Sequence, residues 1–443
     1  MKKKSPVARS KQIENGQEMK LIKAVADLRS MSELNRALKQ NPRDALAYCD
    51  RGLLHCINGD FKSAMNDYER ALEIDPRSHA ARNGRAAVYC EVQDYTRATT
   101  EITKAIKLAP ESPHAYCNRG RMYLEQKLYS QAIVDLNRAL ELGLEGGDIY
   151  LTRGKAYHGI GDLDHALADY NRSIALTPEQ SDCYLHRGDV YREKDDYDNA
   201  IADYTQAITL GQENASTYCD RGIVYGLDAT KNGHEEAICN ALLDFNQAAE
   251  LDMEYAPAYI NRALAYMRLN DYDRAIADCD RALEIDPLCA VAYLNRGTAR
   301  FQKREYAGAI KDYDQAEKLG TDKVSLFYNR GISHYHTGNH DRAIADLGSV
   351  LKAKQYEAFA HNWRGLAYLK KEDHERALAD FNETVRLAPD FTGGYQNRIF
   401  VFTKIIERFG ALAAADGLAI ANCEEELTHN GQWAVRNEWE NGE

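Results

Sequence analysis

Three histidines within seven residues are the side chains best placed to bind a metal ion. His334, His336 and His340 lie in the stretch HYHTGNH, and imidazole nitrogens are common zinc ligands. The stretch crosses from the end of a predicted helix into a turn, and no cysteine or acid adds a conventional zinc spacing. We therefore interpret the three histidines as a chance cluster rather than a metal site.

No other group of side chains has the arrangement of a catalytic site. No glycine-rich loop follows a strand, and no Ser/His/Asp or Cys/His set is distinct from the background of the repeats described below. We therefore predict that the chain is not an enzyme and that it binds no cofactor and no metal.

Arginines and acids recur along the chain at a regular interval. The arginines are Arg51, Arg85, Arg119, Arg153, Arg187, Arg221, Arg262, Arg296, Arg330, Arg364 and Arg398. The acids are Glu33, Asp67, Glu101, Asp135, Asp169, Asp203, Asp244, Asp278, Asp312, Asp346 and Asp380. Each arginine lies among positions that are usually tyrosine, so we expect its stem to be buried, and a buried guanidinium requires a partner.

The two series can be paired in two ways. Pairing inside one repeat would leave Glu33 and Arg398 without partners. Pairing each acid with the arginine of the next repeat leaves none over and keeps a constant spacing of 18 residues. We predict this second arrangement, an ion-pair ladder between repeats. In the second half of the chain its rungs would be Asp278–Arg296, Asp312–Arg330, Asp346–Arg364 and Asp380–Arg398.

The elements that carry these residues repeat every 34 residues. Ten repeats start at residues 45, 79, 113, 147, 181, 215, 256, 290, 324 and 358, and the sixth contains seven extra residues. Within a repeat, positions 4, 8 and 11 lie on one face of a first helix, and positions 20, 24 and 27 lie on one face of a second. Small residues at positions 8 and 20 allow close approach of the two helices. Gly or Asn-Asp near positions 14–16 predicts a turn, and proline at position 32 ends the second helix.

This pattern resembles the tetratricopeptide repeat (TPR) family over about residues 45–391. The arginine at position 7 departs from the family pattern, which favours leucine. The resemblance implies an all-α, right-handed superhelical solenoid whose first helices line a concave groove. We expect a basic tail at 1–10, a degenerate capping repeat at 11–44, capping helices at 392–427 and a polar tail at 428–443. The insertion at 226–240 is expected to lengthen an exposed turn.

Positions 2, 5, 6, 9, 12 and 13 face away from the second helix and would therefore carry a binding site. Asparagine recurs at position 6, although it is a poor helix former, and its amide can both donate to and accept from a peptide backbone. These asparagines are similar to those in the peptide-binding grooves of the family, and they include Asn261, Asn295, Asn329 and Asn397. A solvated polar position or local capping is the alternative. The charges of the cochaperone carboxylate clamp are missing from any three successive repeats.

Apolar residues occupy the same face in the second half of the chain. They include Ile260, Leu264, Met267, Leu294, Phe301, Tyr328, Ile332, Tyr335, Trp363 and Leu366. Packing between helices would absorb some of them, and an exposed remainder would need a ligand. The first half is more charged on this face.

Composition limits the remaining possibilities. The net charge of −12 argues against a nucleic-acid binder, which needs a basic stripe. No apolar stretch is long enough for a membrane span, and ten scattered cysteines favour free thiols in a cytoplasmic protein. We predict a scaffold or adaptor that binds a protein or peptide segment in its groove. The alternatives are a regulatory subunit that controls a partner enzyme and a protein that assembles with itself.

Overall fold

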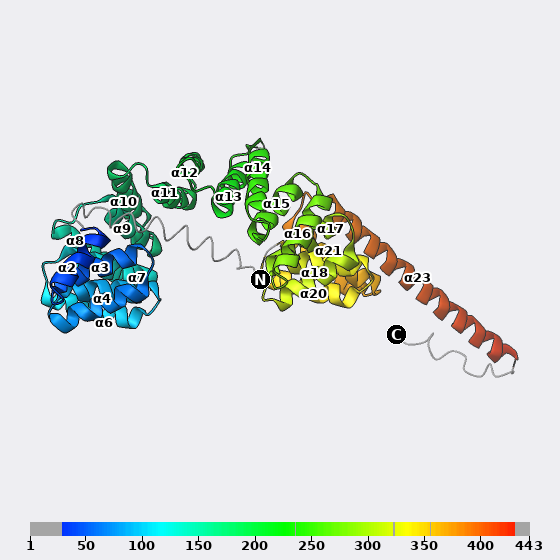
Figure 1. Ribbon diagram of the computed structural model, residues 1–443. Coiled ribbons are helices and arrows are strands. Elements are labelled where there is room, and N and C mark those ends of the chain that lie inside the picture. The colour runs from blue at the N-terminus through cyan, green and yellow to red at the C-terminus, as the bar shows by residue number, and fades with distance from the viewer. Residues whose placement is uncertain (1–28, 235, 322–323, 355, 430–443) are drawn as a thin grey trace, which may run out of the picture. The chain divides into compact units, whose positions relative to one another are not determined.

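The computed structural model describes residues 29–234, 236–321, 324–354 and 356–429, and all regular elements in these ranges are α-helices (Figure 1). The chain divides into two compact parts, residues 1–240 and 241–443, each a stack of helical hairpins. The prediction of an all-α stack of repeats is therefore confirmed.

The first part contains the helices up to α13. They are α2 (Met31–Gln40), α3 (Ala45–Ile57), α4 (Phe61–Ile74), α5 (His79–Glu91), α6 (Tyr95–Leu108), α7 (Pro113–Glu125), α8 (Tyr129–Glu141), α9 (Gly147–Gly159), α10 (Leu163–Leu176), α11 (Ser181–Glu193), α12 (Tyr197–Thr209) and α13 (Ala215–Lys231).

The second part begins within α14. Its helices are α14 (Glu236–Leu251), α15 (Ala256–Arg268), α16 (Tyr272–Ile285), α17 (Ala290–Gln302), α18 (Tyr306–Lys318), α19 (Val324–His336), α20 (His340–Lys352), α21 (Glu357–Lys370), α22 (His374–Leu387) and α23 (Thr392–His429).

The turn between the two helices of a repeat has the same geometry throughout the regular repeats. Position 15 takes a left-handed backbone conformation whether it is glycine, as at Gly59 (φ 73°), or another residue, as at Asn270 (φ 59°). The next residue is often an aspartate that caps the second helix, and the carboxylate of Asp271, for example, accepts from the backbone N–H of Arg274. This turn returns the chain onto its own first helix.

Glycine at position 8 allows an aromatic ring at position 24 to lie directly on the first helix. A Cβ added to Gly297 would stand 2.9 Å from the ring of Tyr313, and the same clash occurs between Gly365 and Phe381. Both rings are fully buried. The small-residue positions of the sequence are therefore the contact between paired helices.

The buried arginines pair within their own repeats, so the predicted ladder of ion pairs between repeats is wrong. Arg262 donates to Asp278 from Nε at 2.8 Å and from Nη2 at 2.6 Å, and Arg296 donates in the same way to Asp312. The observed pairs are Arg51–Asp67, Arg85–Glu101, Arg119–Asp135, Arg153–Asp169, Arg187–Asp203, Arg262–Asp278, Arg296–Asp312, Arg330–Asp346 and Arg364–Asp380.

Each arginine also has a third nitrogen, Nη1, that in most repeats reaches the preceding repeat. Arg296 donates from Nη1 to Asp280 at 2.5 Å, and Arg262 donates to Asn246 at 2.7 Å. An acceptor lies 16 residues before each of these arginines, at position 25 of the preceding repeat, and Arg330 Nη1 also donates to Glu317 at 2.5 Å. The other acceptors are Asn35, Asn137, Asn171, Thr205, Asp314 and Asn382. The arginine therefore does join neighbouring repeats, but through a residue that the sequence analysis did not consider.

Glu33 and Arg398, the first acid and the last arginine of the two series, have other roles. The carboxylate of Glu33 completes a capping box by accepting from the backbone N–H of Ser30 at 2.6 Å. The guanidinium of Arg398 lies 5.3 Å from the centre of the Tyr395 ring, and its Nη1 donates to Asn382 at 3.5 Å. Both side chains thus find their polar or ring contacts near the ends of the repeat stack, without an ion pair from the other series.

Two further expectations differ from the structure. The insertion in the sixth repeat does not lengthen a loop, because α13 continues to Lys231 and α14 starts at Glu236. The buried carboxylate of Asp228 accepts from Asn232 Nδ2 at 2.8 Å and holds the short turn. Residues 392–427, expected to form capping helices, lie within the single helix α23. The basic tail at 1–10, most of the first cap and residues 430–443 lie outside the described residues.

Candidate binding surface

The first helices of the repeats form a continuous row in the second part of the chain. Each first helix contacts the next one directly, from α15 to α17, α19, α21 and α23, whereas the second helices contact mainly first helices. Residues on the outer face of this row are therefore close to residues of the adjacent repeats, as a binding site for an extended segment requires.

An aromatic cluster spans three of these repeats. The Tyr335 and His336 rings of α19 lie 5.4 Å and 5.5 Å from the Trp363 ring of α21, both in edge-to-face geometry. His336 also stacks on Tyr306 at 4.4 Å with nearly parallel planes. Such ring pairs contribute about 0.5–1.5 kcal/mol each beyond their buried area. Burial, together with the charge of Arg304, lowers the pKa of His336, so the ring is neutral at pH 7.

The cluster continues to the start of α21. Tyr328 stacks on Tyr356 at 5.1 Å, and Tyr356 is 51% exposed with a left-handed backbone (φ 52°). We call the five side chains Tyr328, Tyr335, His336, Tyr356 and Trp363 the aromatic surface. His336 and Tyr356 are exposed, whereas the other three are half-buried. The surface combines rings held by packing with two rings that are open to a ligand.

The predicted apolar residues divide between core and surface. Leu294 and Ile332 are buried, and Met267, Phe301 and Leu366 pack against core clusters. Ile260 is half-buried. Leu264 remains exposed at 41%, and Tyr328, Tyr335 and Trp363 belong to the aromatic surface. Packing between helices accordingly buries two of the ten predicted residues and partly covers seven others.

The predicted asparagines make contacts within the chain. Asn261 donates to the carbonyl of Pro257 in its own helix at 2.9 Å, and Asn397 donates to Asn362 of the preceding repeat at 2.9 Å. Asn295 is buried and its side-chain nitrogen has no hydrogen-bond partner. Asn329 lies close to the hydroxyl of Tyr313. Peptide binding by these asparagines stays a prediction, since their amides already have structural contacts or are enclosed.

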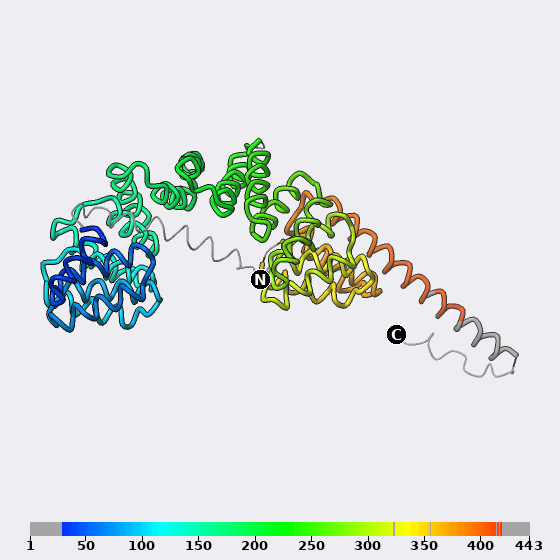
Figure 2. The backbone as a smooth tube through the Cα atoms, viewed as in Figure 1, coloured from blue at the N-terminus to red at the C-terminus, as the bar shows by residue number. Residues whose placement is uncertain are grey.

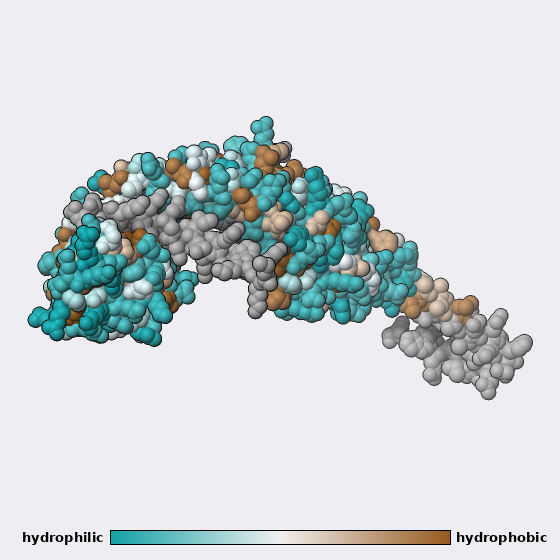
Figure 3. All heavy atoms as spheres, in the orientation of Figure 1, coloured by the Kyte–Doolittle hydropathy of each residue, from teal (hydrophilic) through white to brown (hydrophobic). Residues whose placement is uncertain are grey.

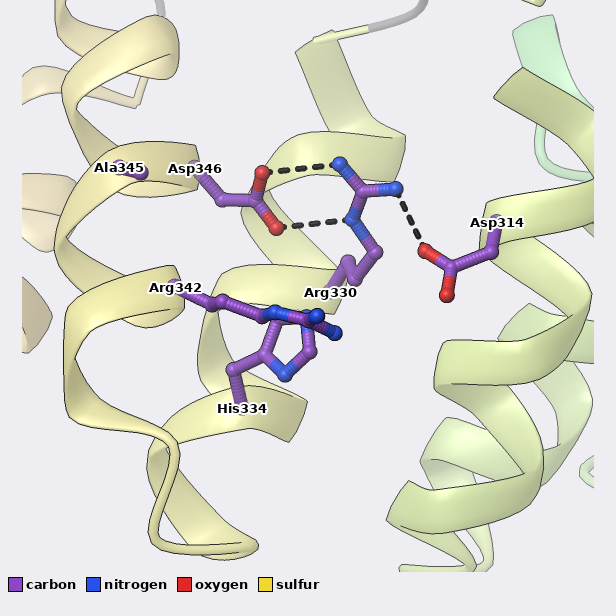
Figure 4. A pocket seen from close by; sticks show the side chains of 6 residues that line it. All are labelled: Asp314, Arg330, His334, Arg342, Ala345 and Asp346. Carbon is purple, nitrogen blue, oxygen red and sulfur yellow. Dashed lines mark hydrogen bonds and ion pairs between the residues drawn. The ribbon is translucent and has the colours of Figure 1, made fainter. Parts of the chain in front are cut away.

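The histidines that open the sequence analysis lie in two different environments. His336 belongs to the aromatic surface, whereas His334 lines a cavity of about 350 Å³ between α18, α19 and α20 (Figure 4). Burial and the charges of Arg330 and Arg342 lower the pKa of His334. Among the described residues, no group of histidines, cysteines or acids has the arrangement of a metal site.

The charged lining of this cavity is largely neutralised by internal pairs. Arg330 donates to Asp346 from two nitrogens at 2.8 and 2.9 Å and to Asp314 at 2.8 Å (Figure 4). Burial alone would lower the pKa of Arg330. The hydrogen bonds to Asp346 and Glu317 outweigh this effect and raise the pKa above its usual value, so Arg330 stays charged. The cavity is therefore an opening beside the structural ion pair.

In the first part of the chain the same face carries a polar network. The Tyr204 hydroxyl donates to the Asp189 carboxylate at 2.7 Å, and Arg192 lies 3.5 Å from Asp189 and 3.9 Å from Asp220. Burial and the nearby Asp189 charge raise the pKa of Asp220 to about 6. The expectation that this half of the face is more charged than the other agrees with this network.

Sequence analysis missed His336 and Tyr356 as members of the aromatic surface, and Tyr306 as the ring on which His336 stacks. Tyr306 and Tyr356 lie just outside the first helices, at the start of a second helix and before α21, so helical periodicity assigns them to no face. His336 was considered only as a metal ligand. Their aromatic character is the feature of the sequence that could have identified them.

Comparison with known proteins gives matches to repeat models along most of the chain. Tetratricopeptide repeat models match residues 45–78 and 256–288, residues 82–144 and 328–390, and residues 147–180, and a TPR repeat model matches residues 188–228. Together these stretches cover more than half of the chain. Comparison with curated proteins gives no match.

Solved structures with similar folds include three of different lengths. A tetratricopeptide repeat protein from Parabacteroides merdae is 20% identical, covering 58% of this chain and 98% of that one, with a TM-score of 0.41. The APC/C hetero-tetramer Cut9-Hcn1 is 14% identical, covering 84% and 92%, with a TM-score of 0.44. YrrB, a TPR protein with an unusual peptide-binding site, is 24% identical, covering 43% and 95%, with a TM-score of 0.36.

Two properties of the described residues bear on the expected environment. No helix among them combines the length and the apolar character that a membrane crossing requires. The nine cysteines from Cys49 to Cys289 are free thiols.

Proposed function

Because the chain belongs to the tetratricopeptide repeat family, whose repeats support a general role as protein-interaction scaffolds, we propose that it binds a peptide or protein segment. The proposed site is the first-helix face of the second part. The observation that carries this proposal is the aromatic surface, which combines packed rings with exposed ones.

The chemistry of this surface suits an apolar or aromatic side chain of a partner. Tyrosine and tryptophan supply large contact areas at low conformational cost and are enriched in binding hot spots. Tyr335 and Trp363 are held by neighbouring rings, so little ordering is needed when a ligand binds. Phe359, which is 47% exposed and lies three residues after Tyr356, adds apolar area at the start of α21. The proposed action is non-covalent and needs no catalytic group of this chain.

A random peptide library displayed on phage provides a probe that does not depend on knowing the partner. Peptides selected on the full chain would be labelled, and their binding would be measured by fluorescence polarisation. The site variant is His336→Ser with Tyr356→Ser, which removes the two exposed rings of the aromatic surface and leaves the core intact. The matched control is Leu243→Ser with Leu251→Ser, because both leucines are exposed on the second helix α14.

We expect the selected peptides to bind the unaltered chain and the control variant alike, and to bind the site variant at least tenfold more weakly. Melting followed by circular dichroism would check that both variants are folded. Equal binding to the site variant and the unaltered chain, or the absence of saturable binding, would refute the proposed site.

A further inference from the structure

The last helix, α23, has an apolar face that no other described part of the chain covers. It is 38 residues long, and it runs away from the last repeats of its part of the chain (Figure 2). Only its beginning is packed: Val401 is fully buried and Ile405 is partly buried against α22. Among the described helices, α21 and α22 are its main neighbours.

Large apolar side chains are concentrated on the uncovered part of α23 (Figure 3). Ile399, Phe402, Ile406 and Phe409 are all exposed, with Ile406 at 70% and Phe409 at 67%. Their spacing of three, four and three residues places them on one side of the helix, and this is the spacing of a coiled-coil seam. We call these four residues the α23 seam.

The helix itself also needs a partner. Helices in proteins derive most of their stability from packing an apolar face, and glycine in a helix interior costs about 1 kcal/mol. α23 contains Gly410 and Gly417, and nothing lies within 4 Å of the Cβ positions built on them. An extended helix with two interior glycines and an uncovered apolar seam is therefore incomplete as a monomer.

We propose that two copies of this chain associate through the α23 seam. A second copy offers a helix with the same spacing of isoleucine and phenylalanine, and a two-fold pair is self-complementary by symmetry. The four seam residues together with the exposed Leu412 present roughly 500 Å² per copy, given that large apolar side chains bury about 150–250 Å² when fully covered. The pair would bury roughly 1,000 Å², which reaches the lower limit for a specific interface.

Light scattering and sedimentation equilibrium on the full chain test this proposal. The chain mass is 50.0 kDa, so the unaltered protein should approach twice that mass as its concentration rises. Ile406→Glu with Phe409→Glu places four charges in the paired seam and should give the monomer mass at every concentration. Both side chains are exposed and lie outside the repeats, so the repeats of the monomer should stay folded, which a cooperative melting transition followed by circular dichroism would check.

The matched control is Phe400→Glu with Leu418→Glu, which changes two equally exposed apolar residues of the same helix. These residues lie on a different side of α23 from the seam, so this variant should still dimerise. A monomeric unaltered chain would overturn the proposal, and so would a dimer that survives Ile406→Glu with Phe409→Glu. Loss of the dimer in the control variant would place the interface elsewhere on α23 and would equally overturn it.

Discussion

The ion pair of Arg296 and Asp312 provides the sharpest test of how the repeats are held. Only 3% of the Asp312 side chain is exposed, and Arg296 binds it through two nitrogens. Burial alone would lower the pKa of Arg296, but the hydrogen bonds to Asp312 and Asp280 raise it above its usual value. Arg296→Met removes the two-nitrogen partner of a buried carboxylate that Arg300 Nη1 still binds at 2.7 Å, and should cost at most about 3–5 kcal/mol of unfolding free energy.

Removing both charges should recover much of this loss. The double variant Arg296→Met with Asp312→Leu replaces the ion pair with apolar side chains, and we expect a coupling of about 1–3 kcal/mol between the two positions. The same cycle for Arg296 and Asp278 should show coupling near zero, because Asp278 is bound by Arg262. Asp280 is 48% exposed, so Asp280→Asn should cost only about 0–1 kcal/mol.

Urea unfolding followed by circular dichroism would measure these cycles. A repeat stack can lose cooperativity when one interface is weakened, so hydrogen exchange of the α17 and α18 amides should accompany the unfolding curves. A coupling between Arg296 and Asp278 larger than that between Arg296 and Asp312 would refute pairing within the repeat. Near-zero coupling in both cycles would show that the ion pair contributes no specific stability.

Two other changes have expected outcomes that unfolding experiments can check. Gly297→Ala should cost about 1–3 kcal/mol because the new methyl group meets the Tyr313 ring. The new methyl group of Gly308→Ala meets only the flexible Arg300 side chain, so this change should be neutral or stabilising by up to about 1 kcal/mol. Equal effects of the two changes on the unfolding free energy would contradict this account. The raised pKa of Asp220, about 6, means that the folded chain retains a proton that the unfolded chain releases near pH 4. Stability should therefore fall as the pH rises from about 4 to 6, and Asp220→Asn should remove this fall and stabilise the protein at pH 7 by at most about 3 kcal/mol. If the unfolding free energy of Asp220→Asn depends on pH in the same way as that of the unaltered chain, the assignment of this fall to Asp220 is refuted.

The repeat pattern determined the local structure because the periodicity of a helix is a property of the chain itself. Small residues at position 8, tyrosine or phenylalanine at position 24 and aspartate at position 16 each act on neighbours within one hairpin. The helices of the regular repeats consequently start where the 34-residue numbering places them, as at Ala290 and Tyr306.

The partners of the buried arginines could not be deduced in the same way. Spacings of 16 and 18 residues both connect two helix faces, and the choice rested on leaving no residue unpaired. In the structure, Glu33 caps α2 and Arg398 lies over Tyr395. Neither residue needs an ion-pair partner from the other series, so counting unpaired residues could not distinguish pairing within repeats from pairing between them. The constant spacing across the insertion was equally uninformative, because α13 and α14 absorb the extra residues as helix.

The sequence by itself thus determined the helices, their turns and the identity of the buried charges, which depend on contacts close along the chain. Only the tertiary structure decided which apolar residues of the first-helix face remain open. Leu294 and Ile332 enter the core while Tyr356 and His336 stay accessible, because side-chain exposure depends on how closely neighbouring repeats pack. The α23 seam shows the same division. The sequence determines the spacing of its apolar residues, whereas only the three-dimensional packing shows that no repeat among the described residues covers them.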